Sequence, residues 1–474
     1  MKLNGVAFMS HPPVAVPEVG KGQEENIPQT LIGFRRTAEK IGKWDSDIII
    51  IISPHGNSFR DAISVIDNGR VTGSLSNFGY NERFLKSVYT KVNDDLKKEW
   101  NEAGISNIFL TKSEARAYRL SLELDHGALV PLYFIDKAYE DYEIIHITPG
   151  HISPIQLYKA GMLMKNIMEQ QTKTYSVIAS GDLSHALKDS GPYTYHPDGE
   201  KFDKLVLDYL KNNKPEKIFG ISNKLKDNAK QCGFNSYAFA LGFVDDVNIN
   251  ITVSSYQGTF GVGYLNGYME VTDKKVDSRL KTIVSLCESK YKDTISKEDV
   301  YIKLARKAIE NKVLDNKRLS WEIFKDENED KKEIEKLERK KSGAFVTINT
   351  NGHLRGCIGT TSSTKASLAE EIISNAISAA TRDPRFSPVT KEELKELEVK
   401  VDVLGEMEHI ESKEMLDVKK YGVVVERKNR RGLLLPDLEG INTIDEQIRI
   451  AKQKANIAPD ADCKLYRFEV IRHE

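Results

Sequence analysis

The sequence contains a run of five isoleucines, Ile48 to Ile52, within the stretch DIIIIISPHG. A strand that is apolar at every position, and not only at every second one, is buried on both faces, as in a parallel sheet covered by helices. The run ends in the turn sequence SPHG, which contains His55. An imidazole therefore stands where a buried strand leaves the core.

Residues 1–272 alternate apolar strands with helical patterns. The strands are expected at NGVAFMS, DIIIIIS, YEIIHIT, YSVIASG and NITVSSYQG, and helical stretches such as IPQTLIGFRRTAEKIGKW lie between some of them. This alternation predicts an α/β domain with a mostly parallel sheet covered by helices.

The 474 residues are too many for one ordinary domain. Residues 273–297 are polar and rich in Lys and Asp, and we expect a connecting region with some helix there. Residues 298–474 mix helical patterns with hairpin-like strands, which predicts a separate α+β domain. One hairpin is expected at GAFVTINTNGHLRGCIG, with a turn at Asn351-Gly352, and a second at YGVVVERKNRRGLLLP.

The charge balance and the spacing of the cysteines limit the functional classes to which the chain can belong. With 29% charged residues and a net charge of −1, the chain has no overall attraction to nucleic acid or to an anionic membrane. The basic run ERKNRRG is short and lacks interleaved aromatic residues, so it indicates a solvated hairpin tip. No apolar run approaches the roughly 20 residues of a membrane helix, and the N-terminus does not resemble a signal peptide. The widely spaced cysteines, without a CxxC motif, are typical of a reducing cytoplasm; they are Cys232, Cys287, Cys357 and Cys463.

Histidines follow several of the predicted strands. His11 ends GVAFMSH, His55 ends the isoleucine strand, and His185 lies just past YSVIASG. Ligands of open α/β sheets bind outside the carboxyl ends of the strands. Each histidine alone could be a hydrogen-bonded structural residue, but their shared position favours a site, and neutral imidazole is the commonest side-chain ligand of transition metals. His126, in LDHGALVPLYF, is a fourth candidate.

The motifs FMSHPP, ISPHG, LDHGALVPL, SGDLSH and GPYTYHPDGEKFD together resemble the LigB-type class III extradiol dioxygenases and the related Memo proteins, over about residues 1 to 270. In the dioxygenases two histidines and a glutamate hold Fe(II), which leaves coordination positions open for a catecholic substrate and dioxygen. The resemblance implies that His11 and His55 are metal ligands. It also implies that His185 is the acid/base histidine and His126 a second pocket histidine.

The third ligand departs from the dioxygenase pattern. The corresponding segment, AKQCGFNSYAFALG, contains Cys232 and no Asp or Glu, whereas the Memo proteins also have a cysteine before glycine here. Two interpretations stay open: Cys232 is a metal ligand or pocket residue, or it is a small buried residue. As a soft ligand it would suit copper(I) or zinc as well as iron. Asp182 either orients the pocket or serves the turn in SGDLS.

In the second half, HLRGCIGT contains Cys357 with Arg355 close by. A nearby cation makes a thiol more reactive; the alternative is a tight hairpin whose glycines allow close packing over a buried cysteine. Together with NAISAATRDPRFSPVTKEELKELEVKVDVL and GLLLP, this stretch resembles the AMMECR domain, over residues 298–474. Asn456 stands where that family usually has glycine.

The two resemblances together match the architecture called AmmeMemoRadiSam system protein A, which implies a radical SAM enzyme as a partner. The chain itself lacks the CxxxCxxC cluster motif. We therefore expect a cytoplasmic, metal-dependent oxidoreductase of extradiol-dioxygenase ancestry, with Fe(II), or copper or zinc, acting on a small and possibly catecholic molecule. The alternative is a metal-binding or adaptor component without dioxygenase turnover.

Overall fold

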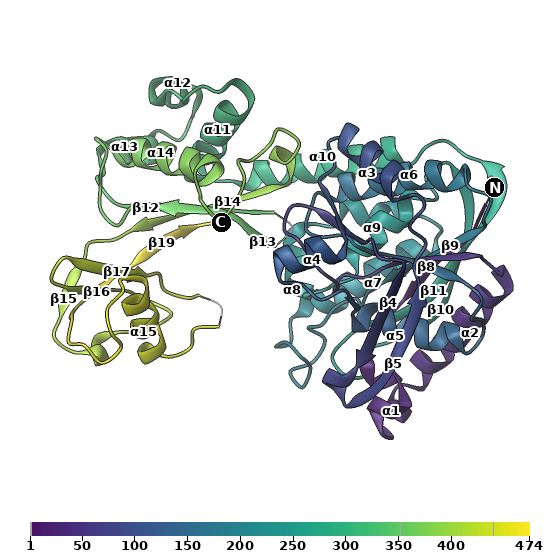
Figure 1. Cartoon of the computed structure of the whole chain (residues 1–474). Helices are drawn as coiled ribbons and strands as arrows, with labels where there is room; N and C mark the ends of the chain where they lie inside the picture. Colours follow the sequence, from purple (N-terminus) through teal and green to yellow (C-terminus); the bar gives the residue numbers. More distant parts are fainter. Residues whose placement is uncertain (1, 351, 439) are drawn as a thin grey trace. The chain divides into compact units, whose positions relative to one another are not determined.

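The computed structural model describes residues 2–350, 352–438 and 440–474. The chain divides into two compact units, the first ending at Lys290 and the second beginning at Tyr291 (Figure 1). Helix α10, Leu280–Lys297, runs across this boundary, so the stretch predicted as a connecting region, 273–297, consists of the end of one strand followed by a helix.

An eight-stranded mixed sheet forms the centre of the first unit, in the order β10-β11-β1-β9-β2-β8-β3-β6. Strands β1, β9, β2 and β8 run parallel to one another, and β3 and β6 run parallel to each other. Strand β11 is antiparallel to both of its neighbours, β1 and β10, and β3 is antiparallel to β8. The predicted α/β class with a mostly parallel sheet is confirmed. The strands are β1 Leu3–Met9, β2 Ile48–Ile52, β3 Ile63–Ile66, β6 Asn107–Leu110, β8 Glu143–Thr148, β9 Tyr175–Ser180, β10 Val247–Gln257 and β11 Tyr264–Lys275.

Helices cover both faces of this sheet (Figure 1). Helices α2 (Pro28–Trp44) and α5 (His126–Asp136) pack on one face, and α6 (Pro154–Glu169) and α9 (Phe234–Gly242) pack on the other with α3 (Asn93–Glu102). Because successive side chains of a strand point to opposite faces, Ile48, Ile50 and Ile52 enter the core beneath α6 and α9, whereas Ile49 and Ile51 enter the core beneath α2 and α5. Two apolar cores explain why the isoleucine run is continuous.

Smaller elements complete the first unit. They are the hairpin β4 (Arg70–Leu75) and β5 (Tyr80–Ser87) with the short β7 (Glu123–Leu124), and the helices α1 (Pro17–Gly20), α4 (Lys112–Tyr118), α7 (Pro197–Lys211) and α8 (Asn223–Ala229). Among the described residues, no helix of either unit is long and apolar enough to cross a bilayer.

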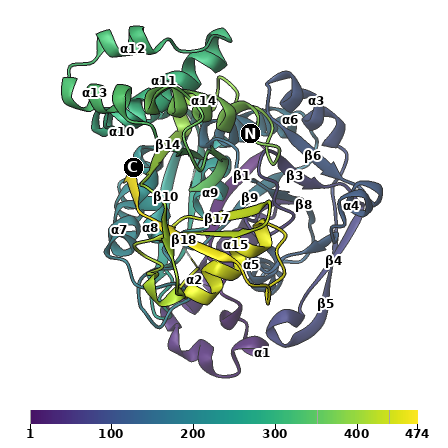
Figure 2. The ribbon, with the colours of Figure 1, turned by 90° about the vertical axis from the view of Figure 1, so that its left-hand side faces the viewer.

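The second unit contains two four-stranded antiparallel sheets, which confirms the separate α+β class. Sheet β13-β12-β14-β19 carries helices α11 and α14 (Figure 1), and sheet β15-β18-β16-β17 carries α15 (Figure 2). The elements are α11 Val300–Asp315, α12 Trp321–Glu327, α13 Lys331–Arg339, β12 Ala344–Thr350, β13 His353–Gly359, α14 Leu368–Thr381, β14 Leu397–Leu404, β15 Glu408–Ile410, β16 Gly422–Arg427, β17 Arg430–Leu434, α15 Ile444–Lys454, β18 Lys464–Phe468 and β19 Val470–His473.

Both predicted hairpins are present, as β12–β13 and β16–β17. The predicted turn at Asn351-Gly352 falls partly outside the described residues, since Asn351 is one of those left out, but Gly352 has a left-handed backbone with φ of 76°. Asn456 is also left-handed, with φ of 52°. Asparagine is among the residues that adopt this conformation most readily, which explains how it replaces a glycine.

Candidate metal centre and active site

The carboxyl ends of three neighbouring parallel strands bring the predicted site residues together. Strands β1, β9 and β2 lie side by side, so the segments that follow them leave the sheet at the same edge. His11 follows β1, His55 follows β2, and Asp182 and His185 follow β9. His126, the first residue of α5, lies at the same edge, with its ring centroid 5.4 Å from that of His11.

Three side chains are spaced as ligands of one metal ion. The Nε2 atoms of His11 and His55 are 3.1 Å apart, and the Sγ atom of Cys232 lies 3.5 Å from His11 Nε2. For bonds of about 2.1 Å to nitrogen and 2.3 Å to sulfur, these separations correspond to angles at the metal of about 95° and 105°. Both angles lie between octahedral and tetrahedral values, so the residues present fit a transition metal.

Hydrogen bonds determine which ring nitrogens of His11 and His185 are free. The Ser180 hydroxyl donates to the carbonyl oxygen of Gly127, so its oxygen accepts from His11 Nδ1–H at 2.9 Å. His185 Nδ1 lies 2.6 Å from the carbonyl oxygen of Lys230, which can only accept, and therefore carries the proton. In their neutral forms both rings leave Nε2 unprotonated, as a metal ligand or a proton acceptor requires.

A close contact between two glycines brings Cys232 to Asp182. A Cβ on Gly181 would lie 2.2 Å from the Cα of Gly233, so only glycine permits this approach of the two loops. As a result, the Asp182 N–H donates to Cys232 Sγ at 3.3 Å. Asp182 Oδ1 accepts from the His11 N–H at 3.0 Å, while Oδ2 lies 3.6 Å from His11 Nε2. Asp182, His185 and Cys232 form a second, overlapping set of possible ligands.

Burial keeps the histidines of the metal-free site neutral. It lowers the pKa of His55 and of His185 to about 4 and holds the pKa of His11 well below its usual value, so the imidazoles are neutral at pH 7. Burial raises the pKa of Asp182 to about 7, and it raises the pKa of the Cys232 thiol. A cavity that holds neutral imidazoles beside a thiol and a carboxyl group is suited to a cation, because binding displaces the acidic protons.

A network of hydrogen bonds centred on Asp125 supports the residues of the site. Asp125 Oδ2 lies 3.0 Å from His146 Nε2, and Asp125 Oδ1 accepts from the Ser53 hydroxyl and from the Ala128 N–H at the start of α5. Burial opposes ionisation of Asp125, but the hydrogen bond to His146 prevails and lowers its pKa. This network positions both the loop before His55 and the helix end that carries His126.

Sequence reasoning missed Ser180 and Asp125, and His146 was not among its candidate site residues. Asp125 did have a signal, since Asp directly before an apolar helical run is a common N-cap. His196, the histidine of the motif GPYTYHPDGEKFD, accepts from the Asp198 N–H at the start of α7, as an N-cap does.

The candidate site opens into a pocket of about 500 Å³. His126 stacks on His55, with centroids 4.6 Å apart and rings inclined by 20°. No Lys or Arg occurs among the described residues that line the pocket. Its lining combines the polar groups already named with apolar and aromatic walls, namely Pro12, Pro13, Val14, Val19, Gln23, Phe78, Tyr193, Val262 and Tyr264.

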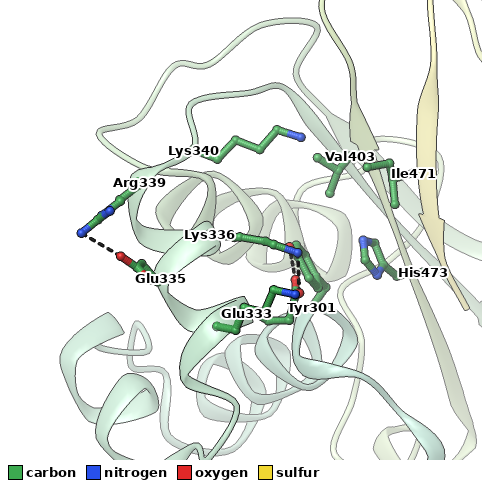
Figure 3. Close-up of a pocket in the computed structure, with 10 residues that line it drawn as sticks. Tyr301, Glu333, Glu335, Lys336, Arg339, Lys340, Val403, Ile471 and His473 are labelled. Carbon is green, nitrogen blue, oxygen red and sulfur yellow. Dashed lines mark hydrogen bonds and ion pairs between the residues drawn. The ribbon is translucent and has the colours of Figure 1, made fainter.

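A larger pocket, of about 760 Å³, lies in the second unit between α13 and β19 (Figure 3). Its charged groups are largely satisfied by one another: Glu333 accepts from Tyr301 and Lys336, and Arg339 pairs with Glu335. The His473 ring stacks on Tyr301 at 3.9 Å. This pocket offers neither a Cys, Ser or Thr nucleophile nor a cluster of metal ligands among its described lining residues, so we do not treat it as the site of chemistry.

The structure also shows which groups surround Cys357, the cysteine of HLRGCIGT. Arg355 pairs with Glu393, at 2.6 Å, and the guanidinium next to Cys357 is that of Arg385, whose Nη2 donates to the Cys357 carbonyl oxygen at 3.3 Å. The Cys357 thiol lies 3.3 Å from the Thr347 hydroxyl. The sequence pointed to this cysteine but not to its neighbouring cation.

The chain is similar in sequence to several known proteins, over its whole length or over part of it. The chain is 40% identical to protein CA_C1420 of Clostridium acetobutylicum over 479 residues, which covers 100% of both chains. A Thermotoga maritima protein is 49% identical over 179 residues, covering 37% of this chain and 98% of that protein. The crystal structure of an uncharacterized protein from Pyrococcus horikoshii matches with 32% identity and a TM-score of 0.33, covering 37% of this chain and 91% of that one.

Two family models match successive parts of the chain. The model of the catalytic LigB subunit of aromatic ring-opening dioxygenase matches residues 5–266, and the AMMECR1 model matches residues 302–473. The chain therefore belongs to the LigB family, with an AMMECR1 domain following the LigB domain.

Proposed function

We propose that the first unit is a metal-dependent oxidoreductase related to the class III extradiol dioxygenases and that it acts on a small aromatic diol. The observation that carries the proposal is the convergence of His11 Nε2, His55 Nε2 and Cys232 Sγ at the carboxyl edge of the sheet, where the two histidines line a pocket. A metal held there would lower the pKa of a coordinating hydroxyl and, if redox-active, exchange electrons with dioxygen.

His185 is the proposed proton acceptor. Its Nδ1–H is held by the Lys230 carbonyl oxygen, and the low pKa that burial imposes keeps its Nε2 unprotonated at pH 7. It therefore enters the reaction ready to take a proton from a substrate hydroxyl, which is the role of a general base. His126, stacked on His55 and lining the same pocket, is the proposed second catalytic histidine, which holds the substrate by a hydrogen bond.

The walls of the pocket favour an uncharged aromatic substrate. Phe78, Tyr193 and Tyr264 supply ring surfaces, and Val14 and Val262 supply apolar contacts. A substrate carboxylate would meet no cation among the described lining residues, and burying an unpaired charge is costly. We therefore propose that the substrate is a neutral catechol and not a carboxylated one.

The thiol of Cys232 affects which metal ion the site would prefer, and it is the reason for a second candidate function. Fe(II) is the metal expected from the family, while a thiolate in place of a carboxylate also suits copper(I) and zinc. This soft ligand is the observation that favours the second candidate, in which the unit binds metal without dioxygenase turnover. In that role the chain would be a metal-binding or adaptor component that serves a partner enzyme, for which a radical SAM enzyme is the proposal.

The test is purification without oxygen, quantification of bound metal, and oxygen uptake with catechol and with 3,4-dihydroxybenzoate. The first proposal expects bound metal, uptake with catechol, and weaker uptake with the carboxylated compound. His185→Gln should keep its metal and lose uptake, whereas His409→Gln, which changes an exposed histidine of the second unit, should behave like the wild type.

Stoichiometric bound metal without oxygen uptake in the presence of any diol would reject the first candidate function and support the second. Unchanged metal content in both His55→Ala and Cys232→Ser would reject the metal centre, and with it both candidates.

A further inference from the structure

The directions of the strands give the central sheet of the first unit a second carboxyl edge. Strands β3 and β6 are parallel neighbours, and β3 is antiparallel to β8. Because β8 runs parallel to β2, the carboxyl ends of β3 and β6 lie at the edge opposite to the one that carries the metal ligands. Ligands of open α/β sheets bind outside the carboxyl ends of parallel strands, so a second, separate site can form there.

The segments that follow β3 and β6 line one pocket, of about 320 Å³. The segment after β3 supplies Asn68 and Arg70, and helix α4, which begins just after β6, supplies Lys112 and Arg116. This volume lies at the lower end of the range of small-molecule sites, roughly 300–1,000 Å³. The other described lining residues are Val71, Thr72, Ala115, Leu120 and Leu122.

Local hydrogen bonds hold the backbone on both sides of this pocket. Helix α4 begins with a capping box, in which the Thr111 side chain accepts from the Glu114 N–H and the Glu114 side chain accepts from the Thr111 N–H at 3.2 Å. In the turn after β3, Asn68 Nδ2 donates to the Arg70 carbonyl oxygen. The cationic side chains are exposed, but the backbone segments that carry them are therefore fixed.

The charges of this pocket all have one sign. Arg70, Lys112 and Arg116 form no ion pair among the described residues, and the described lining contains no Asp or Glu. The larger pocket of the second unit differs, because its Lys336 and Arg339 are paired with glutamates. Three cations around one small cavity repel one another and attract an anion.

The positions of two of these cations are unfavourable for the helix that carries them. Lys112 and Arg116 are four residues apart on α4, a spacing at which like charges destabilise a helix. Lys112 also lies in the first turn of α4, where the helix dipole disfavours a cation. A surface without a ligand gains no stability from this arrangement, whereas a bound anion would pair with the cations and remove their repulsion.

We propose that this pocket is a second ligand site, at which Arg70, Lys112 and Arg116 bind a small molecule that carries a phosphate or several carboxylates. The shared chemistry is the set of anionic oxygens, since a planar guanidinium donates two parallel hydrogen bonds to either group. The half-buried Leu120 and Leu122 offer apolar contacts to the rest of the molecule. Because the pocket and the metal ligands lie at opposite edges of the sheet, this site does not depend on the oxidoreductase function proposed above.

Pyrophosphate and citrate, titrated separately into the full-length protein at constant ionic strength, test the site by calorimetry. The wild type should show one saturable site, and the anion that binds more tightly identifies phosphate or carboxylate as the preferred group. Arg70→Gln and Arg116→Gln should each weaken binding by at least about tenfold, as expected for the loss of hydrogen bonds between charged groups. Arg119→Gln removes the same charge from the end of α4 but not from the pocket lining, so it should bind like the wild type.

The same titrations with His55→Ala separate this site from anion binding at the metal centre. The variant lacks one of the proposed metal ligands and should still bind the anion with wild-type affinity. Loss of anion binding in His55→Ala would assign the anion to the metal centre and overturn the proposal. The absence of saturable binding of either anion by the wild type, or equal affinities of Arg116→Gln and Arg119→Gln, would also overturn it, and the three cations would then be solvated surface charges.

Discussion

Ser180→Ala tests whether a hydrogen bond holds His11 ready for metal. The Ser180 oxygen is the acceptor for His11 Nδ1–H, at 2.9 Å, and this contact directs the unprotonated Nε2 toward His55 and Cys232. Loss of such a supporting contact typically weakens metal binding by about 10- to 100-fold, or about 1.4 to 2.8 kcal/mol. The same change leaves the Gly127 carbonyl without its donor, which should cost the metal-free fold about 1–3 kcal/mol.

The assay is competition for metal against a chromophoric chelator without oxygen, with denaturant unfolding of the metal-free protein measured on the same sample. Ser176→Ala is the matched control, because Ser176 lies on the same strand, is equally buried, and its hydroxyl has no hydrogen-bond partner among the described residues. It should retain wild-type metal affinity at little cost in stability. Equal metal affinity in Ser180→Ala and Ser176→Ala would refute the reasoning, whatever the change in stability.

Three further predictions concern other parts of the structure. Gly181→Ala should weaken metal binding, because its Cβ would displace the Gly233 backbone and with it Cys232; unchanged chelator competition would contradict this. Glu298→Ala should destabilise the second unit by about 3–5 kcal/mol in denaturant unfolding, because it leaves the buried Arg306 unpaired; a loss below about 1 kcal/mol would place the pair among weak surface contacts. The hydrogen bond from Arg385 lowers the pKa of Asp383, so its contribution to stability is present above the unfolded value of about 3.9 and is lost as the pH falls toward the folded pKa. Asp383→Asn should therefore reduce the loss of stability between pH 5 and about pH 2, which unfolding at a series of pH values measures.

Much of the architecture followed from local patterns. The isoleucine run indicated a strand between two helical layers because no other common environment buries every side chain of a strand. The two hairpins of the second unit followed from apolar runs around turn residues. His11, His55 and His185 could be assigned to one site from the sequence alone, because parallel strands place their carboxyl ends at the same edge of the sheet.

The sequence could not supply the contacts that depend on loop conformation. Cys232 reaches His11 only because Gly181 and Gly233 let two distant loops meet. Ser180 looks like any small residue of a buried strand, and Ser176 on the same strand has no comparable partner.

The cation beside Cys357 is another contact that the sequence could not supply. Arg355 is nearer in sequence, but β13 directs it to Glu393, while Arg385 arrives from the segment after α14. The sequence by itself determined five strands of the central sheet, the two hairpins and the separate class of the second unit, and the histidines at the sheet edge, because hydrophobic periodicity and strand direction are local properties of the chain. Only the tertiary structure decided which thiol, carboxylate and cation stand within bonding distance, because such distances depend on how separate loops pack against one another.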